Sequence, residues 1–400
     1  MKERNLALIV MDTMRLDEFN RLEQRHKLFS SLGHAAFVEK CIAPSPWTLP
    51  SHASIFTGLY PSEHGAHETK RIKALDIDHI KLKMPTFVSE LNALGYNTYA
   101  ISANPYVTPI YGFSDFSHFY EESYFTDIFG SVVEVSDRLK PLVAKYRNLY
   151  GTNLFKISLA VLNDEPDLFL ELLASASLRT PIAALKKIKA KVFEGWPIEK
   201  GGSRIVKRIK QEPLEEPYFL FVNLMEAHEP YVEKKGMDLN WATPFLKKGP
   251  DQKTINLWKR LYAKAASKAY AYAAEIAKTL LKGADNETMV VVTSDHGQAF
   301  GEHDFFGHGT VLYDEVVRVP LVLLSSRQVD KVRPGYCSLV NLKEFIMEYV
   351  AGKESMQKLY SKTVYAQSFG VPANINITNA IDIKKLRKFD RKSVRRFTYA

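Results

Sequence analysis

Residues 288–297 read TMVVVTSDHG, an apolar, β-branched run that changes abruptly into serine, aspartate, histidine and glycine. The run lacks the alternation of polar and apolar residues, which is typical of a strand buried on both faces of a sheet. Residues 218–223 (YFLFVN) have the same character. We predict further strands in shorter apolar runs at residues 7–11, 98–102 and 319–324.

Helical segments separate these runs. Residues 84–94, for example, precede Gly95, and glycine often ends a helix because it adopts the left-handed backbone conformation. Buried strands that alternate with helices predict an α/β fold, in which helices sandwich a mostly parallel central sheet. In such sheets ligands bind beyond the carboxyl ends of the strands. The polar residues that directly follow each run are therefore the first candidates for a functional site.

The chain is 400 residues long, which allows one large α/β domain with additions. We expect this catalytic domain to cover residues 1–350 and to contain a helical insertion at about residues 125–211, where the apolar spacing is helical. Residues 351–400 are predicted to form a small C-terminal subdomain with strands at 363–367 and 395–399. The chain stops near the last of these strands, which suggests a shortened form of a longer protein.

Charge and cysteine content narrow the choice of partners and compartment. The formal net charge is +9, and a basic excess favours anionic ligands. The basic runs at residues 184–210 and 384–396 are interpreted first as solvated helix faces, and no nucleic-acid recognition motif accompanies them. Cys41 and Cys337 form neither a metal-ligand motif nor a disulfide framework. Without a signal-peptide pattern or an apolar run of about 18 residues, we expect a cytoplasmic protein with no membrane span.

Acidic and imidazole side chains follow three of the predicted strands. Asp12 follows the first strand, Asp295 and His296 follow the run at 288–293, and His228 comes shortly after residues 218–223. Parallel strands place their carboxyl ends at one edge of a sheet, so these groups should meet. Carboxylate and imidazole ligands suit Mg²⁺, Ca²⁺, Mn²⁺ or Zn²⁺. An aspartate after a strand also commonly caps the next helix, so it is the convergence of several such residues that favours a metal site.

A further candidate lies in residues 45–61 (SPWTLPSHASIFTGLYP), where Pro50 suits the first turn of a helix and Gly58 suits its end. Thr48 is therefore predicted at a helix N-terminus, where the helix dipole favours negative charge. Two interpretations stay open on the local sequence. Thr48 or Ser51 simply caps a short helix, or the Thr48 hydroxyl is a nucleophile activated by a cation.

Four segments together resemble one protein family. Residues 48–61 resemble the sulfatase signature, Cys-x-Pro-Ser-Arg followed by a helix that ends in Thr-Gly-x-Tyr-Pro. Residues 219–231 (FLFVNLMEAHEPY), 290–321 and 7–17 resemble further segments of that family, in the family's order. The chain is thus similar to the sulfatase branch of the alkaline phosphatase superfamily over nearly its whole length except the insertion. The resemblance implies a hydrolase of sulfate or phosphate esters that depends on a divalent metal ion.

The resemblance also implies roles for individual residues. The metal ligands would be Asp12, Thr13, Thr48, Asp295 and His296. One metal site is favoured over two, because the additional Asp-x-x-x-His pair of two-zinc members is not found. Thr48 would also be the nucleophile, while His228 and His308 would contact the transferred group or protonate the leaving group. The predicted substrate contacts are His52, Asn104 and His303.

Departures from the family pattern favour phosphate chemistry. Thr48 occupies the position of the Cys or Ser that true sulfatases convert to formylglycine, and threonine cannot be converted in this way. His52 replaces the signature arginine, Thr13 replaces a second metal aspartate, and Asn104 stands where the family has Lys-x-His. Threonine nucleophiles in this superfamily resemble those of phosphodiesterases and phospho-headgroup transferases. We therefore expect cleavage of phosphate or phosphonate esters by in-line attack of Thr48.

Two other functions stay open. A transferase that moves a phospho-headgroup to a sugar or lipid acceptor would use similar chemistry, although such transferases are usually tethered to membranes. A sulfatase-like binding protein without catalysis would have little reason to keep the cation-binding residues. The expected substrate is an anionic ester of a small molecule, glycan or lipid headgroup. Lys186, Lys187 and Lys189 of the insertion are predicted to recognise additional negative charge on it.

Overall fold

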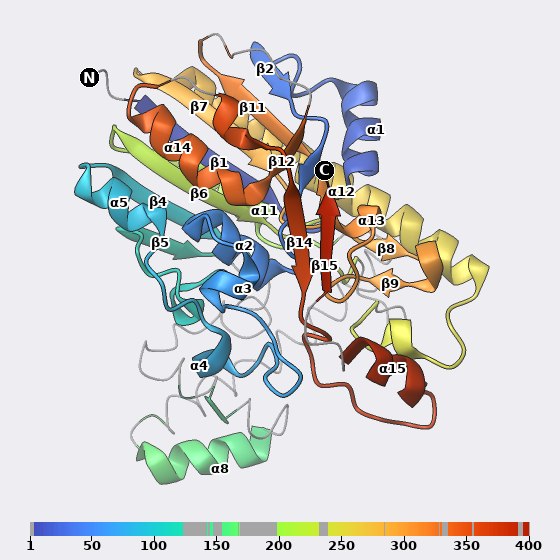
Figure 1. Cartoon of the computed structure of the whole chain (residues 1–400). Coiled ribbons are helices and arrows are strands. Elements are labelled where there is room, and N and C mark those ends of the chain that lie inside the picture. Colours follow the sequence, from blue (N-terminus) through green and yellow to red (C-terminus); the bar gives the residue numbers. More distant parts are fainter. Residues whose placement is uncertain are drawn as a thin grey trace. The chain divides into compact units, whose positions relative to one another are not determined.

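The structure is a computed structural model of the whole chain (Figure 1). It describes residues 4–122, 154–166, 198–231, 239–283, 285–327, 335–353, 356–390 and 395–399, and residues 142, 145, 146, 168 and 329. Residues 1–123 and 197–400 form one compact unit, and residues 124–196 form a second. Each unit is described by itself.

The central sheet of the first unit has seven strands in the order β2-β11-β7-β1-β6-β4-β5. The strands with parallel neighbours are β7 (Glu287–Thr293), β1 (Arg4–Met11), β6 (Tyr218–Leu224), β4 (Asn97–Ser102) and β5 (His118–Glu121). Strand β11 (Leu321–Ser325) runs antiparallel to β7, and β2 (His34–Phe37) runs antiparallel to β11. The predicted α/β class with a mostly parallel sheet is confirmed.

The predicted strand at 319–324 is divided at Pro320. Proline has no N–H to donate to a sheet ladder, so it is confined to strand ends and edges. Residues before it form β10 (Arg318–Val319), which pairs in a second sheet of order β10-β3-β12-β13. The partners there are β3 (Cys41–Ile42), β12 (Tyr336–Ser338) and β13 (Tyr360–Ser361).

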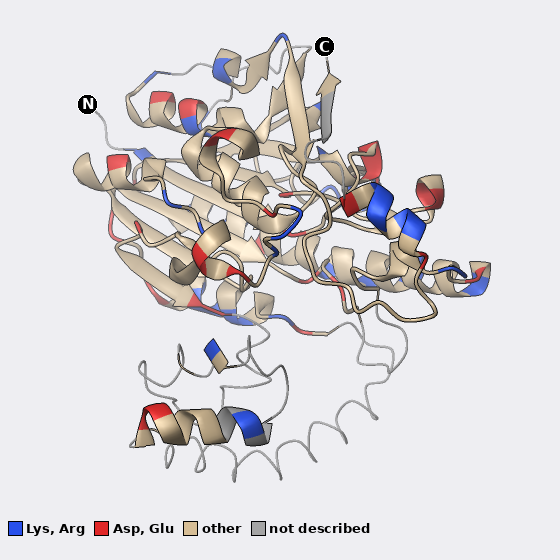
Figure 2. Cartoon of the chain, turned by 60° about the horizontal axis from the view of Figure 1, so that its bottom comes forward, with Lys and Arg blue, Asp and Glu red and all other residues tan. Residues whose placement is uncertain are grey.

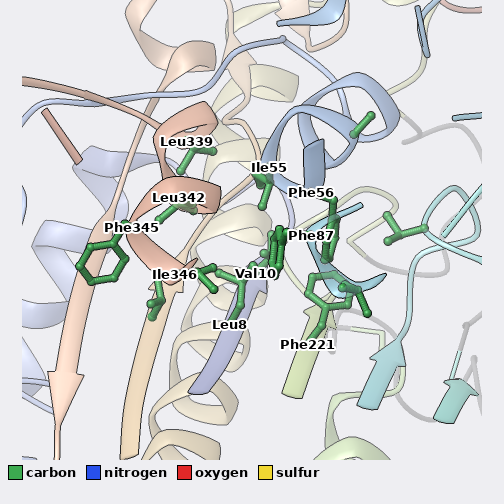
Figure 3. Packing of buried hydrophobic residues seen from close by; sticks show 14 of the residues in the cluster. Leu8, Val10, Ile55, Phe56, Phe87, Phe221, Leu339, Leu342, Phe345 and Ile346 are labelled. Carbon is green, nitrogen blue, oxygen red and sulfur yellow. The ribbon is translucent and has the colours of Figure 1, made fainter. Parts of the chain in front are cut away.

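Helices cover both faces of the central sheet because its strands are apolar on both faces. In β1, Leu6, Leu8 and Val10 enter one apolar cluster, while Ala7, Ile9 and Met11 enter another. The first cluster includes side chains of α2 (Thr48–Thr57), α5 (Phe87–Ala93) and α14 (Leu342–Val350). Figure 3 shows this packing, with Leu8 and Val10 beside side chains of α2 and α14. The second cluster includes α1 (Leu16–His26), α11 (Gly202–Gln211) and α12 (Gln252–Gly283).

Shorter elements connect these layers. The helices are α3 (Pro61–His64), α4 (Ile77–Ile80), α13 (Asp314–Val317) and α15 (Ile383–Asp390), with 3₁₀ turns at Pro109–Tyr111, Thr243–Phe245, Glu302–Asp304, Leu339–Asn341 and Met356–Leu359. Strands β8 (Ala299–Phe300) and β9 (Phe306–Gly307) pair with each other. Strands β14 (Val364–Ser368) and β15 (Arg395–Tyr399) pair where the two terminal strands were predicted.

The second unit overlaps most of the predicted insertion, and its described helix is α8 (Leu154–Asp164). Helix α11 lies inside the predicted range 125–211 but belongs to the first unit, as do residues 351–400. The boundaries given to a C-terminal subdomain stay a prediction. Lys186, Lys187 and Lys189 lie outside the described residues. Across the ranges that the structure describes, no helix is both long enough and apolar enough to cross a membrane.

Basic and acidic residues occur together on many elements (Figure 2), and the two cysteines lie close together. Figure 2 shows Lys and Arg on many surface elements together with Asp and Glu, and the second basic run includes helix α15. Cys41 and Cys337, far apart in the chain, lie on the paired strands β3 and β12 with their sulfur atoms 3.8 Å apart. Both thiols are buried and free.

Candidate active site

The carboxyl ends of the parallel strands deliver polar residues to one place. Asp12 directly follows β1, Asn104 follows β4, and Asp295 and His296 follow β7. Thr48 is the first residue of α2. All of these side chains are buried. The predicted ligands at the strand ends therefore come together as the parallel topology requires.

Asp12, Thr48, Asp295 and His296 form a group that we call the cation cluster. The Thr48 hydroxyl oxygen lies 3.4 Å from Asp12 Oδ2 and 3.4 Å from His296 Nε2. His296 Nε2 lies 3.4 Å from Asp295 Oδ2 and 3.9 Å from Asp12 Oδ1. His296 Nδ1 faces the carbonyl oxygen of Gly297 at 3.0 Å. A carbonyl only accepts, so Nδ1 carries the hydrogen and Nε2 directs its lone pair into the cluster.

The donor set of the cation cluster fits a divalent metal ion. Asp12 Oδ1 and Asp295 Oδ2 are buried oxygens for which the described residues offer no hydrogen-bond partner. Buried carboxylate oxygens are normally paired, because removing a charge from water without compensation is costly. Asp12, Asp295 and His296 have ligand atoms within 4.8 Å of one another. Carboxylate oxygens suit Mg²⁺, Ca²⁺ or Mn²⁺, and carboxylates together with an imidazole suit Zn²⁺.

Without a bound ion, burial disfavours the charged forms of Asp12, Asp295 and His296. Burial, reinforced by the neighbouring Asp295, raises the pKa of Asp12 to about 6. Burial likewise raises the pKa of Asp295 to about 7 and lowers the pKa of His296. A bound cation reverses this balance, since its charge favours the ionised carboxylates and the neutral imidazole.

Neighbouring groups hold the two carboxylates in place. Asn104 Nδ2 donates to Asp12 Oδ2 at 2.6 Å, and its Oδ1 accepts from the backbone N–H of Tyr106. The backbone N–H of Thr13 donates to Asp295 Oδ1 at 3.3 Å. Thr13 has a φ of 59°, an unusual value for a residue with a branched side chain. Its buried hydroxyl has no hydrogen-bond partner among the described residues, which is compatible with its predicted role at the metal.

Helix α2 begins without a side-chain cap, which bears on the two interpretations of Thr48. Trp47 is the N-cap residue, and it makes no capping hydrogen bond. Ser51 donates instead to the carbonyl oxygen of Asp295 at 2.7 Å. The Thr48 hydroxyl is therefore directed to Asp12 and His296, not to the helix backbone. Gly58, at φ 72°, ends the helix as predicted.

His52 lies next to this cluster, and both of its ring nitrogens have hydrogen-bond partners. Its Nδ1 lies 3.0 Å from the Thr48 carbonyl oxygen, and its Nε2 accepts from Asn223 Nδ2 at 3.2 Å. Burial lowers the pKa of His52 to about 3, so the ring is neutral. This geometry fixes the first turn of α2 on the sheet. The substrate contact proposed for His52 stays a prediction.

A second group, here called the histidine cluster, contains His228, Glu229, Gln298 and His308. The rings of His228 and His308 are 5.1 Å apart, and the His308 ring lies 4.5 Å from that of His296. Gln298 is fully buried and its Oε1 lies 2.6 Å from His308 Nδ1. Glu229 lies between the two histidines, with carboxylate oxygens 3.6 Å from His228 Nδ1 and 3.8 Å from His308 Nδ1.

His303 lies apart from these contacts. Its side chain is 55% exposed, its ring stacks on Tyr313 at 4.2 Å, and its Nε2 lies 3.8 Å from Glu315. Its φ is 53°, which places this residue in the left-handed region. No described contact joins His303 to either cluster, and its predicted substrate role is not supported by a contact in the site.

Three residues of the site were missed by the sequence analysis. Glu229 and Gln298 stand one and two residues beyond the histidines His228 and His296, so their position after a strand end was an available signal. Lys200 carried no such signal, because it stands in a basic run with no motif. It is buried, its ammonium group donates to the carbonyl oxygen of His228, and burial lowers its pKa to about 8 against the opposing charge of Glu226.

Models of two known families match two parts of the chain. A family model described as Sulfatase matches residues 197–352, which include the histidine cluster and the ends of β6 and β7. A model of the Type I phosphodiesterase / nucleotide pyrophosphatase family matches residues 6–76, which include Asp12 and Thr48. The predicted resemblance to the sulfatase family is confirmed.

One curated relative is similar to a short stretch of this chain. An uncharacterised sulfatase, YidJ of Escherichia coli strain K12, is 43% identical over 47 residues, which cover 11% of this chain and 10% of that protein. The matched stretch is thus about a tenth of the length of that curated relative.

Solved structures are similar over the whole chain. A phosphonate monoester hydrolase from Silicibacter pomeroyi matches with a TM-score of 0.60 and 14% identity, over 99% of this chain and 85% of that one. The phosphonate monoester hydrolase of Agrobacterium radiobacter matches with a TM-score of 0.55 and 12% identity over the same shares. At this identity the likeness shows a shared fold and nothing further.

Proposed function

We propose that this chain is a metal-dependent hydrolase of phosphate or phosphonate esters in which Thr48 is the nucleophile. The observation that carries the proposal is the position of the Thr48 hydroxyl. It lies at the N-terminus of a ten-residue helix and within 3.4 Å of both Asp12 and His296, beside buried carboxylate oxygens without partners. A hydroxyl beside a cation site and a helix N-terminus is in a favourable place to become an anion.

The residues divide the chemistry between them. Asp12, Asp295 and His296, with the Thr48 oxygen, would hold the metal ion, and Thr13 is a further candidate. When bound, the ion neutralises ester oxygens and favours ionisation of the Thr48 hydroxyl. Thr48 would attack phosphorus in line while its hydroxyl proton passes to the free Nε2 of His228 or His308, and the bond from phosphorus to the leaving oxygen breaks. The same Nε2 then returns the proton it has received to that leaving oxygen.

Release requires a second displacement. Water attacks the phospho-threonine, its proton passes to a histidine Nε2, and the Thr48 oxygen leaves with a proton. A sulfated threonine would have no comparably easy release, and threonine cannot take the formylglycine route. The match of a phosphodiesterase family model to the segment that contains Thr48 also supports phosphate over sulfate.

The test compares chromogenic sulfate, phosphate monoester, phosphodiester and phosphonate esters, each with Mn²⁺, Ca²⁺, Zn²⁺ or EDTA. The parent, Thr48→Ala and the matched variant Thr48→Ser are assayed side by side. We expect metal-dependent cleavage of a phospho-ester that Thr48→Ala abolishes and Thr48→Ser partly retains, since serine keeps the attacking oxygen. Mass spectrometry of quenched reactions should show a phosphorus-containing adduct on the peptide with Thr48.

Other outcomes would point elsewhere. Sulfate-ester turnover that survives Thr48→Ala would overturn the mechanism. An adduct on Thr48 that is discharged only by an added alcohol would identify a transferase. Binding of the metal ion without turnover or adduct on any ester would favour a binding protein.

A further inference from the structure

Gln298 has no role in the proposed reaction, yet its side chain has defined partners at both ends. Its Oε1 lies 2.6 Å from His308 Nδ1, while its Nε2 donates to Glu229 Oε2 at 3.2 Å and lies 3.3 Å from the Tyr231 hydroxyl. Its backbone is also held, because Arg15 donates to the Gln298 carbonyl oxygen at 2.8 Å. A fully buried amide held at three points is a rigid element of the site.

The chemistry of these partners fixes the orientation of the amide. Glu229 is a carboxylate and only accepts hydrogen bonds, so the NH₂ end of Gln298 must face it. The opposite orientation would place a carbonyl oxygen against a carboxylate oxygen. With the NH₂ end on Glu229, the carbonyl end faces His308 Nδ1, and that nitrogen must carry the hydrogen. The neutral His308 ring then has its lone pair on Nε2.

His228 has the same tautomer for a related reason. Its Nδ1 lies 2.6 Å from the carbonyl oxygen of Glu229, which also only accepts. Lys200 donates to the carbonyl oxygen of His228 and so also holds the loop that carries His228 and Glu229. Both histidines therefore carry the hydrogen on Nδ1, where His228 donates to the Glu229 carbonyl oxygen and His308 donates to Gln298 Oε1, and both keep a free Nε2.

We propose that Gln298, oriented by Glu229, is a positioning residue that fixes His308 as the Nδ1–H tautomer and so keeps its Nε2 lone pair available to the reacting group. The inference rests on the proposed function for its effect on turnover, but the tautomer itself does not depend on it. Ring nitrogens that must receive and return a proton need such a fixed tautomer, because a hydrogen already on Nε2 would block the transfer.

The kinetic test exchanges the two partners. Gln298→Glu places two carboxylates against each other. Adding Glu229→Gln restores the pairing in reverse. The new amide at position 229 donates to the new carboxylate at position 298, which accepts from His308 Nδ1. We expect Gln298→Leu and Gln298→Glu to lower kcat about 10- to 100-fold with little change in KM, as for other outer partners of catalytic histidines. The double variant Gln298→Glu/Glu229→Gln should recover most of the loss caused by Gln298→Glu.

A matched control separates positioning from loss of a buried amide. Gln367 is also fully buried, and its Oε1 accepts from the backbone N–H of Ser62. Gln367→Leu removes that bond elsewhere in the same unit and should alter thermal stability while kcat stays near the parent value. A double variant whose loss equals the product of the two single losses would overturn the proposal.

The spectroscopic test needs no turnover. In protein labelled with ¹⁵N at its 11 histidines, the ring shifts of His308 are assigned by comparison with His308→Gln. Above the titration range, the parent should show the Nδ1–H form, and Gln298→Leu should shift the ring toward the Nε2–H form. An Nε2–H ring in the parent, or an unchanged tautomer in Gln298→Leu, would reject the proposal. If no ester is cleaved while the tautomer changes as expected, the proposed reaction fails and the positioning role stands.

Discussion

The cation cluster and the histidine cluster lie beside each other, yet they differ in how their polar atoms are satisfied. In the cation cluster, Asp12 Oδ1 and Asp295 Oδ2 are buried without a hydrogen-bond partner among the described residues. In the histidine cluster, the Nδ1 atoms of His228 and His308 and both ends of Gln298 are paired. Unpaired carboxylate oxygens buried beside an imidazole suit a bound cation. Completed pairs indicate groups that are already oriented and keep one nitrogen free.

The largest effect should come from removing a charge from the cation cluster. In Asp295→Asn, Oδ1 still accepts from Thr13 and His296, and an NH₂ group replaces the unpaired Oδ2. We expect the thermal stabilisation by Mn²⁺ to disappear and kcat/KM to fall by at least about 10³-fold, as when a group that stabilises developing charge is lost. The same variant should be no less stable than the parent in EDTA, because a buried charge has been removed.

Calorimetry with and without metal checks both parts of this expectation. Glu315→Gln is a suitable control, because Glu315 Oε2 is also buried without a described partner but faces His303, outside the cation cluster. If Asp295→Asn retains Mn²⁺ binding while Glu315→Gln loses it, the assignment of the ion to the cation cluster is wrong.

The second-largest expected effect is on the pH dependence of stability. Stability should fall with rising pH in metal-free protein and should rise with pH when metal is present. The folded-state pKa values of Asp12 and Asp295 are raised to about 6 and about 7 from 3.8. A raised carboxyl pKa means that the folded protein holds more protons, so metal-free stability from this pair is lost as pH rises through 6 and 7. Metal binding expels those protons, and apparent affinity should rise by on the order of 10³-fold from pH 5 to pH 8.

Thermal unfolding at pH 5 and pH 8, in EDTA and in saturating Mn²⁺, measures the difference. Other groups also titrate, so the comparison is made between the parent and Asp295→Asn at each pH. The variant should show a smaller loss of metal-free stability with rising pH. An equal loss in both proteins would mean that Asp295 is ionised in the folded state without metal.

A smaller effect is expected where a partner orients a ligand without binding the ion. Asn104→Ala removes the 2.6 Å hydrogen bond to Asp12 and leaves a second oxygen of that carboxylate less constrained. Metal affinity should fall about 10- to 100-fold, with partial recovery of activity at high Mn²⁺. Asn341→Ala, which removes a half-buried amide from Leu359 and Ser361 instead, is the control. A loss of activity in Asn104→Ala at unchanged metal affinity would restore its predicted role as a substrate contact.

The sequence was sufficient for the fold class because its strands are apolar on both faces. The runs YFLFVN and TMVVVT have no polar alternation, and β6 and β7 are fully buried on either side of β1. The direction of β11 could not be read in the same way. A run that is apolar on both faces fits a parallel or an antiparallel neighbour equally well, and only the path of the chain through Pro320 decides.

Strand positions alone predict the convergence only of residues that directly follow a strand. Asp12, Asp295 and His296 have positions fixed by β1 and β7, so their convergence follows from the topology. Gln298 and Glu229 meet because two loops from different strands approach each other, and no local pattern encodes that approach. Spacing also cannot tell which histidine of a loop turns inward.

His303 and His308 provide the smallest and most direct test of that point. They belong to one segment, but His303, at φ 53°, turns its exposed ring onto Tyr313, while the His308 side chain is 2% exposed and pairs with Gln298. Replacing an exposed side chain outside the site usually changes free energies by about 0.5 kcal/mol or less, so His303→Ala should alter kcat/KM by no more than about twofold. His308→Ala should lower it by about 10²-fold or more, as for loss of a general acid or base. If His303→Ala instead raises KM tenfold at unchanged kcat, the substrate extends beyond the two clusters to the surface beside Tyr313, and the sequence-based assignment of His303 is correct.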